Sequence, residues 1–244
     1  MTDLQIAVIA VAFTIAGIAK GTVGTGLPPI AIGIMAFAVP LETAIAIMTV
    51  PTLATNIWQA GYGRNLFVLL RRFGVMAVVL VVTVLAVSTL GELGSPAMST
   101  ALGAMLALYA VIALVAWRPA VTRRAERWAN PVVGVVTGIV TGTTGLSAVP
   151  FLPYMQSLDI DKDDLVQALG ILFVFITAAL ALALVHQGSY DRANLASGFG
   201  AILPSALGMW IGQKLRGVMS AETFRRIFLF GLLAIGLHMA RGLL

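Results

Sequence analysis

Long apolar stretches separated by short polar connections follow one another along the whole chain. A helix that crosses the roughly 30 Å hydrocarbon core of a bilayer needs about 20 apolar residues. The connections at 61–65 and 188–192 are rich in glycine and polar turn residues. The pattern therefore predicts a bundle of membrane helices. The expected helical segments are 4–20 with 28–39, 43–60, 73–90, 97–117, 131–141 with 149–158, 165–186, 194–213 and 224–240.

The first apolar stretch is interrupted by glycines and prolines between Lys20 and Pro29. Glycine adds backbone entropy, and proline fixes φ and lacks an N–H, so a helix does not continue through such a run. Pro28 and Pro29 suit the first turn of a new helix, where a missing donor costs little. We therefore expect a helix, an irregular stretch and a second, short helix within one membrane segment.

A similar interruption recurs in the second half of the chain. Residues 17–30 align without gaps on residues 138–151, and six positions are identical, where average composition gives roughly one. The identical pairs are Gly17/Gly138, Ile18/Ile139, Gly21/Gly142, Thr22/Thr143, Gly24/Gly145 and Pro29/Pro150. The prediction is an all-α integral membrane protein with a single transmembrane domain, 1–244, made of two homologous repeats, 1–120 and 130–244. Each repeat is a broken or re-entrant helix pair followed by three transmembrane helices.

Composition agrees with a membrane location. Hydrophobic residues make up 59% of the chain and charged residues 10%, against about 25% charged in soluble domains. The formal net charge of +5 comes from basic residues between apolar segments, which is the positive-inside pattern and not a sign of nucleic-acid binding. Asp3 and the absence of a basic region before the first apolar run argue against a cleaved signal peptide.

The orientation depends on whether each broken segment crosses the membrane. If each crosses once, the halves run parallel, and nine of the fifteen lysines and arginines are cytoplasmic. If each is a re-entrant hairpin, the halves are inverted, both termini are periplasmic, and twelve are cytoplasmic. Since lysine and arginine set orientation, the inverted arrangement is favoured. The arms of the second pair, expected to be about 15 Å long at 1.5 Å per residue, also suit a hairpin. The twelve are Arg64, Arg71, Arg72, Arg118, Arg123, Arg124, Arg127, Lys162, Lys214, Arg216, Arg225 and Arg226.

Irregular backbone at membrane depth is stable only where protein buries it or where it lines a wet cavity. Two symmetry-related breaks that meet near the midplane form the substrate site of many secondary transporters. The second arm of each pair begins at the break, and its free N–H groups and positive dipole end favour an anion. We expect glycine backbone, threonine and serine hydroxyls and Asn56 to line this site. The predicted substrate-binding residues are Lys20, Gly21, Thr22, Gly24, Thr25, Gly26, Asn56, Gly142, Thr143, Thr144, Gly145 and Ser147.

Lys20 is the one basic residue in the broken segment, and Thr141 is its counterpart in the second repeat. An ionisable residue at membrane depth points to function, so contact with an anion is one reading. The other is that Lys20 extends to the membrane interface. Gly17 and Gly138 have the spacing of close helix packing with Gly21 and Gly142, and we assign Gly17 and Gly138 to packing.

Nothing in the sequence indicates an enzyme, a cofactor or a metal site. The chain has no cysteine, and His186 and His238 form no metal-binding pattern. The glycine-rich run lacks the Gly-Lys-Ser/Thr of a phosphate-binding loop.

The paired breaks at 17–29 and 138–150 resemble those of the TauE/SafE family of sulfite and organosulfonate exporters, and the order of segments extends the likeness over nearly the whole chain. The resemblance implies transport of a small sulfur-containing anion such as sulfite, sulfoacetate or another organosulfonate. We therefore expect a multi-pass secondary transporter of the cytoplasmic (inner) membrane that works by alternating access. The alternatives are an anion channel and a non-transporting membrane subunit. Coupling to a proton or sodium ion and homo-oligomer formation stay open, and lipid surrounds the protein.

Overall fold

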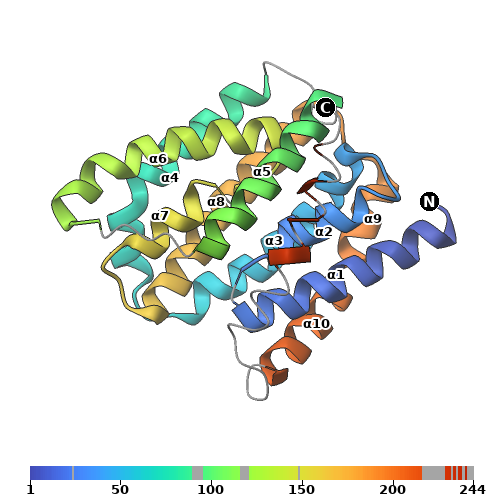
Figure 1. Cartoon of the computed structure of the whole chain (residues 1–244), viewed down its shortest axis with the longest axis horizontal. Coiled ribbons are helices and arrows are strands. Elements are labelled where there is room, and N and C mark those ends of the chain that lie inside the picture. Colours follow the sequence, from blue (N-terminus) through green and yellow to red (C-terminus); the bar gives the residue numbers. More distant parts are fainter. Residues whose placement is uncertain are drawn as a thin grey trace. The chain divides into compact units, whose positions relative to one another are not determined.

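The computed structural model describes residues 1–23, 25–89, 96–115, 121–147, 149–215, 229–231, 233–234, 236–237 and 240. Within these residues the regular elements are helices, joined by one isolated β-bridge between Val121 and Leu158. The all-α prediction is therefore confirmed (Figure 1). The helices are α1 (Asp3–Val23), α2 (Leu27–Met35), α3 (Leu41–Tyr62), α4 (Leu66–Ser88), α5 (Pro96–Val115), α6 (Arg123–Thr144), α7 (Phe151–Ser157), α8 (Lys162–His186), α9 (Arg192–Gly200) and α10 (Ile202–Leu215).

The chain divides into two compact units, and each unit draws on both halves of the sequence. Unit 1 consists of Met1–Thr52, Gly94–Leu114 and Gly188–Leu244, and unit 2 consists of Leu53–Leu93 and Val115–Gln187. In unit 1, α1 packs against α2 and along α10. In unit 2, α4 packs against both α6 and α8. Each unit therefore contains one broken helix pair and a helix from the other half of the chain that supports it.

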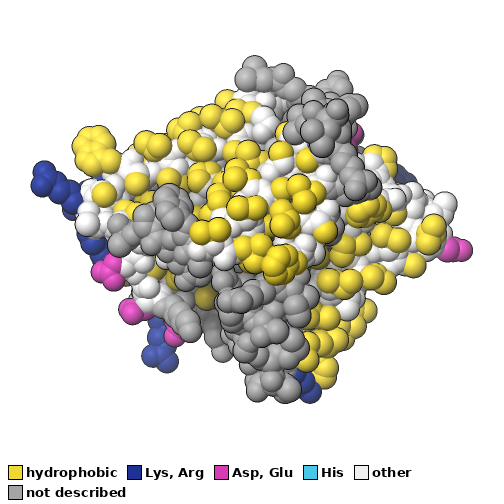
Figure 2. All heavy atoms as spheres, viewed as in Figure 1, with side chains coloured by type: hydrophobic (Ala, Val, Ile, Leu, Met, Phe, Trp, Pro, Cys, Tyr) yellow, Lys and Arg dark blue, Asp and Glu magenta, His cyan; other side chains and the backbone are white. Residues whose placement is uncertain are grey.

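Four helical stretches among the described residues are long and apolar enough to cross a membrane. They are Asp3–Thr22, Leu66–Ser88, Asp163–His186 and Arg192–Leu215, the last formed by α9 and α10 together. Helix α4 illustrates their two faces, because Leu69, Phe73 and Leu80 are buried while Val75 and Val82 are exposed. Hydrophobic side chains cover much of the face drawn in Figure 2, with charged side chains at its margins. Such apolar outer surfaces suit contact with lipid rather than water.

Two predicted segments are wrong at their starts. Helix α4 begins at Leu66 instead of residue 73, and Arg71 and Arg72 lie inside it. Helix α6 begins at Arg123 instead of residue 131, and Pro131 lies inside it. Its 22 residues extend about 33 Å at 1.5 Å per residue, so the first arm of this pair is not the half-bilayer arm that we expected. The Thr122 hydroxyl accepts from the Ala125 N–H at 3.3 Å and caps the helix. The expected segment 224–240 falls largely outside the described residues.

Both broken pairs return to the end at which they start. In unit 1, the Gln5 side-chain amide at the beginning of α1 donates to the Ala38 carbonyl, past the end of α2, at 3.1 Å. In unit 2, the Val121 N–H, just before α6, donates to the Ser157 carbonyl at the end of α7 at 3.1 Å. In each pair, a hydrogen bond within its own unit therefore joins the start of the first helix to the end of the second helix.

Candidate functional site

The first break separates α1 from α2 by three residues. Helix α1 ends at Val23 and α2 begins at Leu27, so the predicted interruption is confirmed. Gly26 precedes α2 with φ of 103°, a left-handed conformation that glycine adopts without strain. Pro28 lies in the first turn of α2, as we predicted. Gly24 lies outside the described residues.

The prolines that start these helices also reduce the number of donors they offer. Of the first three residues of α2, Leu27 alone has an N–H, because Pro28 and Pro29 have none. Helix α7 opens with two N–H groups, from Phe151 and Leu152, before Pro153. The helix ends therefore present fewer free N–H groups to an anion than ordinary N-termini do.

Lys20 is buried in unit 1, in the last turn of α1. It is 6% exposed, so it does not extend to the outer surface as an interfacial lysine does. A cation in the last turn of a helix also stabilises the negative end of the helix dipole. Lys20 and Arg64 are the two basic residues among residues 1–65.

Three of the predicted threonines use their hydroxyl hydrogens within the protein. Thr22 bonds to the carbonyls of Ile18 and Ala19 at 3.0 and 2.9 Å. Thr143 and Thr144 bond to the Val140 carbonyl at 3.1 and 2.7 Å. A hydroxyl has one hydrogen to donate, so in this conformation these side chains present acceptor lone pairs rather than donors.

The second break begins with a left-handed glycine. Helix α6 ends at Thr144, and Gly145 follows with φ of 72° while its N–H donates to the Thr141 carbonyl at 2.8 Å. Ser147 is buried. The Val149–Pro150 peptide bond is cis, and α7 starts at Phe151. The first arms of the two pairs end at equivalent positions, Val23 and Thr144, which are 121 residues apart like Gly17 and Gly138.

Gly21 and Gly142, both predicted to contact substrate, face neighbouring helices. A Cβ on Gly21 would overlap the Met209 carbonyl of α10, and one on Gly142 would lie 2.9 Å from the Val87 Cβ of α4. Gly17 and Gly138 are packed in the same way, against Ser205 and Thr83. The prediction that Gly17 and Gly138 serve packing is confirmed, and the same role extends to Gly21 and Gly142.

The structure gathers the predicted residues into two groups. Lys20, Gly21, Thr22, Thr25 and Gly26 belong to unit 1, while Asn56 and residues 142–147 belong to unit 2. Asn56 is 1% exposed on α3. A common cavity for both breaks stays a prediction.

Thr141 is a buried residue that the sequence prediction left out of the site. It is fully buried, and its hydroxyl has no hydrogen-bond partner among the described residues, as is also true of Thr137 one turn earlier. The alignment that pairs Thr141 with Lys20 is the signal that points to it. A buried hydroxyl without a partner is unfavourable by about 1–3 kcal/mol.

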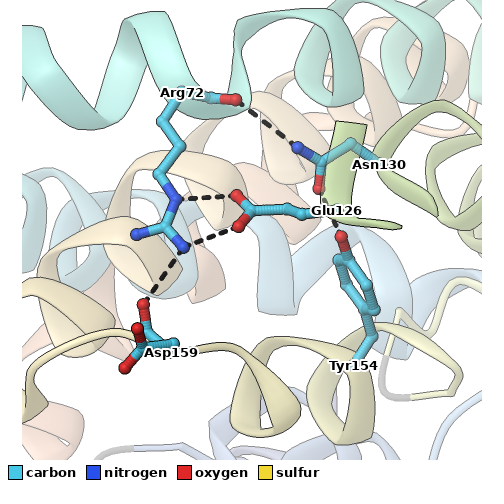
Figure 3. Close-up of polar contacts among 5 residues, drawn as sticks. All are labelled: Arg72, Glu126, Asn130, Tyr154 and Asp159. Carbon is cyan, nitrogen blue, oxygen red and sulfur yellow. Dashed lines mark hydrogen bonds and ion pairs between the residues drawn. The ribbon is translucent and has the colours of Figure 1, made fainter. Parts of the chain in front are cut away.

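A polar cluster at one end of unit 2 was not foreseen from the sequence (Figure 3). The Arg72 guanidinium of α4 donates to both carboxylate oxygens of Glu126 on α6, at 2.7 and 2.8 Å, and to the Asp159 carbonyl at 3.3 Å. The Tyr154 hydroxyl of α7 donates to Asn130 at 2.6 Å, and Asn130 donates to the Arg72 carbonyl at 3.4 Å. The cluster therefore ties the starts of α4 and α6 to the end of α7.

One signal in the sequence could have revealed this cluster. Glu126 is the sole acidic residue in a stretch that holds Arg118, Arg123, Arg124 and Arg127. A lone carboxylate next to an apolar segment usually has a partner when it is buried, and the side chain of Glu126 is 6% exposed. Its partner lies 54 residues away in the chain, which no local pattern identifies.

Comparison with known families gives a match over most of the chain. Residues 9–239 match the model of the family described as sulfite exporter TauE/SafE. Comparisons with curated proteins and with solved structures found no match.

Proposed function

The chain belongs to the sulfite exporter TauE/SafE family, and we propose that it exports a small sulfur-containing anion, such as sulfite, sulfoacetate or another organosulfonate, by alternating access. The family consists of membrane transporters rather than enzymes. The apolar helices of the described chain agree with that location. The match over nearly the whole chain is the observation that carries the proposal.

The proposed topology is two inverted repeats, each with a re-entrant first pair. The hydrogen bonds from Gln5 to Ala38 and from Val121 to Ser157 support it, because a hairpin returns to the side on which it starts. A pair that crossed the membrane once would separate these residues by the bilayer thickness, about 30 Å. The inner membrane is the proposed location, with residues 71–72, 121–127 and 159 on the cytoplasmic side.

The proposed substrate-binding residues, apart from Asn56 on α3, lie at the breaks of the two helix pairs. Lys20 supplies positive charge, and the N–H groups of Leu27, Phe151 and Leu152 supply donors at the helix starts. The remaining proposed residues from the sequence prediction are Thr22, Gly24, Thr25, Gly26, Asn56, Thr143, Thr144, Gly145 and Ser147, while Gly21 and Gly142 act through packing. Such a site binds an anion with one buried formal charge and a few backbone dipoles.

Reconstitution in liposomes tests the proposal. Purified protein should show saturable uptake of sulfite or a taurine-like sulfonate, with counterflow when the inside is preloaded, and little uptake of carboxylates. Sulfate is the fourth anion in the panel. Lys20→Met should weaken uptake, while Arg124→Gln, an exposed arginine far from the breaks in the sequence, is the control.

Each other outcome identifies an alternative. Rapid single-channel conductance without counterflow would replace the transporter by an anion channel. No flux and no binding of any of these anions would contradict transport and favour a membrane subunit that acts through a partner.

A further inference from the structure

A cleft of about 400 Å³ opens between the starts of α4 and α6 in unit 2. Its lining is unusually basic for a surface next to apolar helices, since it contains four arginines and one glutamate and therefore carries a formal charge of +3. The lining residues are Arg71, Arg72, Val75, Arg123, Glu126, Arg127 and Asn130. All of them belong to unit 2.

The buried part of the cleft is held in place by the Arg72–Glu126 pair. Both side chains are largely covered, at 15% and 6% exposure, and the two parallel hydrogen bonds give the pair a defined geometry. Glu126 thereby neutralises Arg72. The second terminal nitrogen of Arg72, Nη1, makes no hydrogen bond to the described residues, and Figure 3 shows it directed away from Glu126.

The other three arginines make no ion pair with the described residues. Arg71, Arg123 and Arg127 are exposed, and within the described part of the chain the one ion pair is that of Arg72 with Glu126. Arg123 is also the first residue of α6, so the positive end of the helix dipole adds to the potential there. One guanidinium group can donate two parallel hydrogen bonds to two oxygens of a phosphate or sulfonate group.

We propose that this cleft binds an oxyanion group, either a free sulfur oxyanion or the phosphate of an anionic lipid headgroup. Both have the same chemistry, which is a compact anion with several acceptor oxygens. Basic pockets between membrane helices on the cytoplasmic side are known to suit lipid headgroups. A free anion bound there would instead be concentrated next to the transporter.

Positive-inside topology alone is the competing explanation for these arginines, and it predicts no dependence on position. Arg124 provides the contrast, because it lies between Arg123 and Arg127 in the chain, is exposed, and does not line the cleft. Arg64 is likewise exposed and outside the lining. The double variants Arg123→Gln/Arg127→Gln and Arg64→Gln/Arg124→Gln therefore remove the same charge from different places.

Equilibrium binding to the purified full chain tests the inference. Sulfate is titrated calorimetrically at constant ionic strength in a neutral detergent, and retained phosphatidylglycerol is measured by native mass spectrometry against phosphatidylcholine. We expect the cleft variant to lose at least about tenfold in affinity for one of the two probes, and the Arg64/Arg124 variant to stay within about twofold. A double lysine variant, Arg123→Lys/Arg127→Lys, keeps the charge and should recover part of the binding. Melting temperatures check that all variants are folded.

Each result has a defined meaning. Sulfate binding lost in the cleft variant identifies a free anion, and phosphatidylglycerol binding lost in that variant identifies a lipid headgroup. Equal losses in the two double-glutamine variants, or no binding of either probe to the unaltered protein, would overturn the inference. The inference does not depend on the proposed export, because binding is measured without flux.

Discussion

The two broken helices of this protein are supported by different kinds of helix contact. In unit 1, α1 and α10 meet glycine against glycine: a Cβ on Gly17 or Gly21 would overlap backbone of α10, and a Cβ on Gly208 or Gly212 would overlap backbone of α1. In unit 2, α6 meets α4 through Gly138 and Gly142, but the nearest atoms belong largely to the side chains of Thr83 and Val87. A shared glycine spacing has thus produced a rigid seam in one unit and a more adaptable one in the other.

The two hairpins are closed by different kinds of contact, and the difference follows from the residues at equivalent positions. Gln5 and Ala38 lie 121 residues before Glu126 and Asp159, the same interval that relates Gly17 to Gly138. In unit 1, Gln5 bonds directly to the Ala38 carbonyl. In unit 2, Arg72 bridges Glu126 and the Asp159 carbonyl. Equivalent positions are thus joined by a neutral bond in one unit and by an ion pair in the other.

The largest effect should come from breaking the charged closure. Glu126→Gln leaves the Arg72 guanidinium largely buried without its counter-charge, which costs about 3–5 kcal/mol for a buried pair, and we expect the lower end because Arg72 is partly exposed. Thermal unfolding in detergent measures it, with Arg124→Gln as the control. A Glu126→Gln protein as stable as the unaltered one would show that the pair does not hold unit 2 together.

The next largest effect should come from alanine at equivalent glycines of the two helix contacts, α1 with α10 and α6 with α4. Gly21→Ala places a methyl group against the α10 backbone, which cannot turn aside, so we expect a loss of about 1–3 kcal/mol. Gly142→Ala meets the Val87 side chain, which can shift, and the loss should be below about 1 kcal/mol. Unfolding in detergent measures both.

Gly61→Ala is the matched control for these two variants. Gly61 lies in α3 with no atom within 4 Å of an added Cβ, so alanine there should stabilise the helix by up to about 1 kcal/mol. A larger loss for Gly142→Ala than for Gly21→Ala would reverse the comparison of the seams.

The third comparison concerns Lys20 and its counterpart Thr141. If Lys20 contacts the anion, Lys20→Met removes a charge-assisted bond of about 1.5–3 kcal/mol and should raise the KM of uptake at least about tenfold. Thr141→Val removes a hydroxyl that has no partner among the described residues, so KM should stay within about twofold. The flux assay in liposomes reports both values.

A second pair of measurements separates binding from structure at Lys20. Lys20→Arg keeps the cation and should retain most of the uptake, while the melting temperature of Lys20→Met reports any loss of helix stability. An unchanged KM with a lowered melting temperature would assign Lys20 to the end of α1 rather than to the substrate.

The smallest effect should follow from removing the neutral closure. Gln5→Leu deletes one partly buried hydrogen bond to Ala38, for a loss of about 0.5–1.5 kcal/mol. Thermal unfolding of Gln5→Leu and of Glu126→Gln under the same conditions compares the stability lost when each closure is removed. Equal losses would mean that the ion pair adds nothing beyond the hydrogen bond.

Local chemistry in the sequence was sufficient for the helix breaks. The glycines and prolines that exclude a continuous helix predicted breaks between residues 20 and 28 and between 141 and 149. The helices run three residues further into each break, to Val23 and Thr144, and α2 starts at Leu27. The starts of α4 and α6 were missed because apolar length was the criterion for a segment. Arg71 and Arg72 interrupt the apolar stretch of α4, and four of the eight residues 123–130 are charged. Pro131 was taken for a helix start, whereas the Thr122 cap begins the helix two turns earlier.

Features of the candidate site that follow from residue type and adjacent residues were predictable, and features that depend on distant helices were not. The left-handed Gly26 and Gly145 follow from residue type. That Gly21 and Gly142 face α10 and α4 depends on helices far away in the sequence. The basic cleft likewise joins residues 71–75 to residues 123–130, so orientation was the one role predicted for these arginines.

The prolines at the starts of α2 and α7 have a consequence for selectivity. An ion that leaves water for these breaks exchanges a full hydration shell for few N–H groups, since Pro28, Pro29 and Pro153 offer none. The cost of dehydration rises with the square of the charge in the Born description. Singly charged sulfonates and bisulfite should therefore be accepted in preference to divalent sulfate, a discrimination produced by missing donors rather than by added ones.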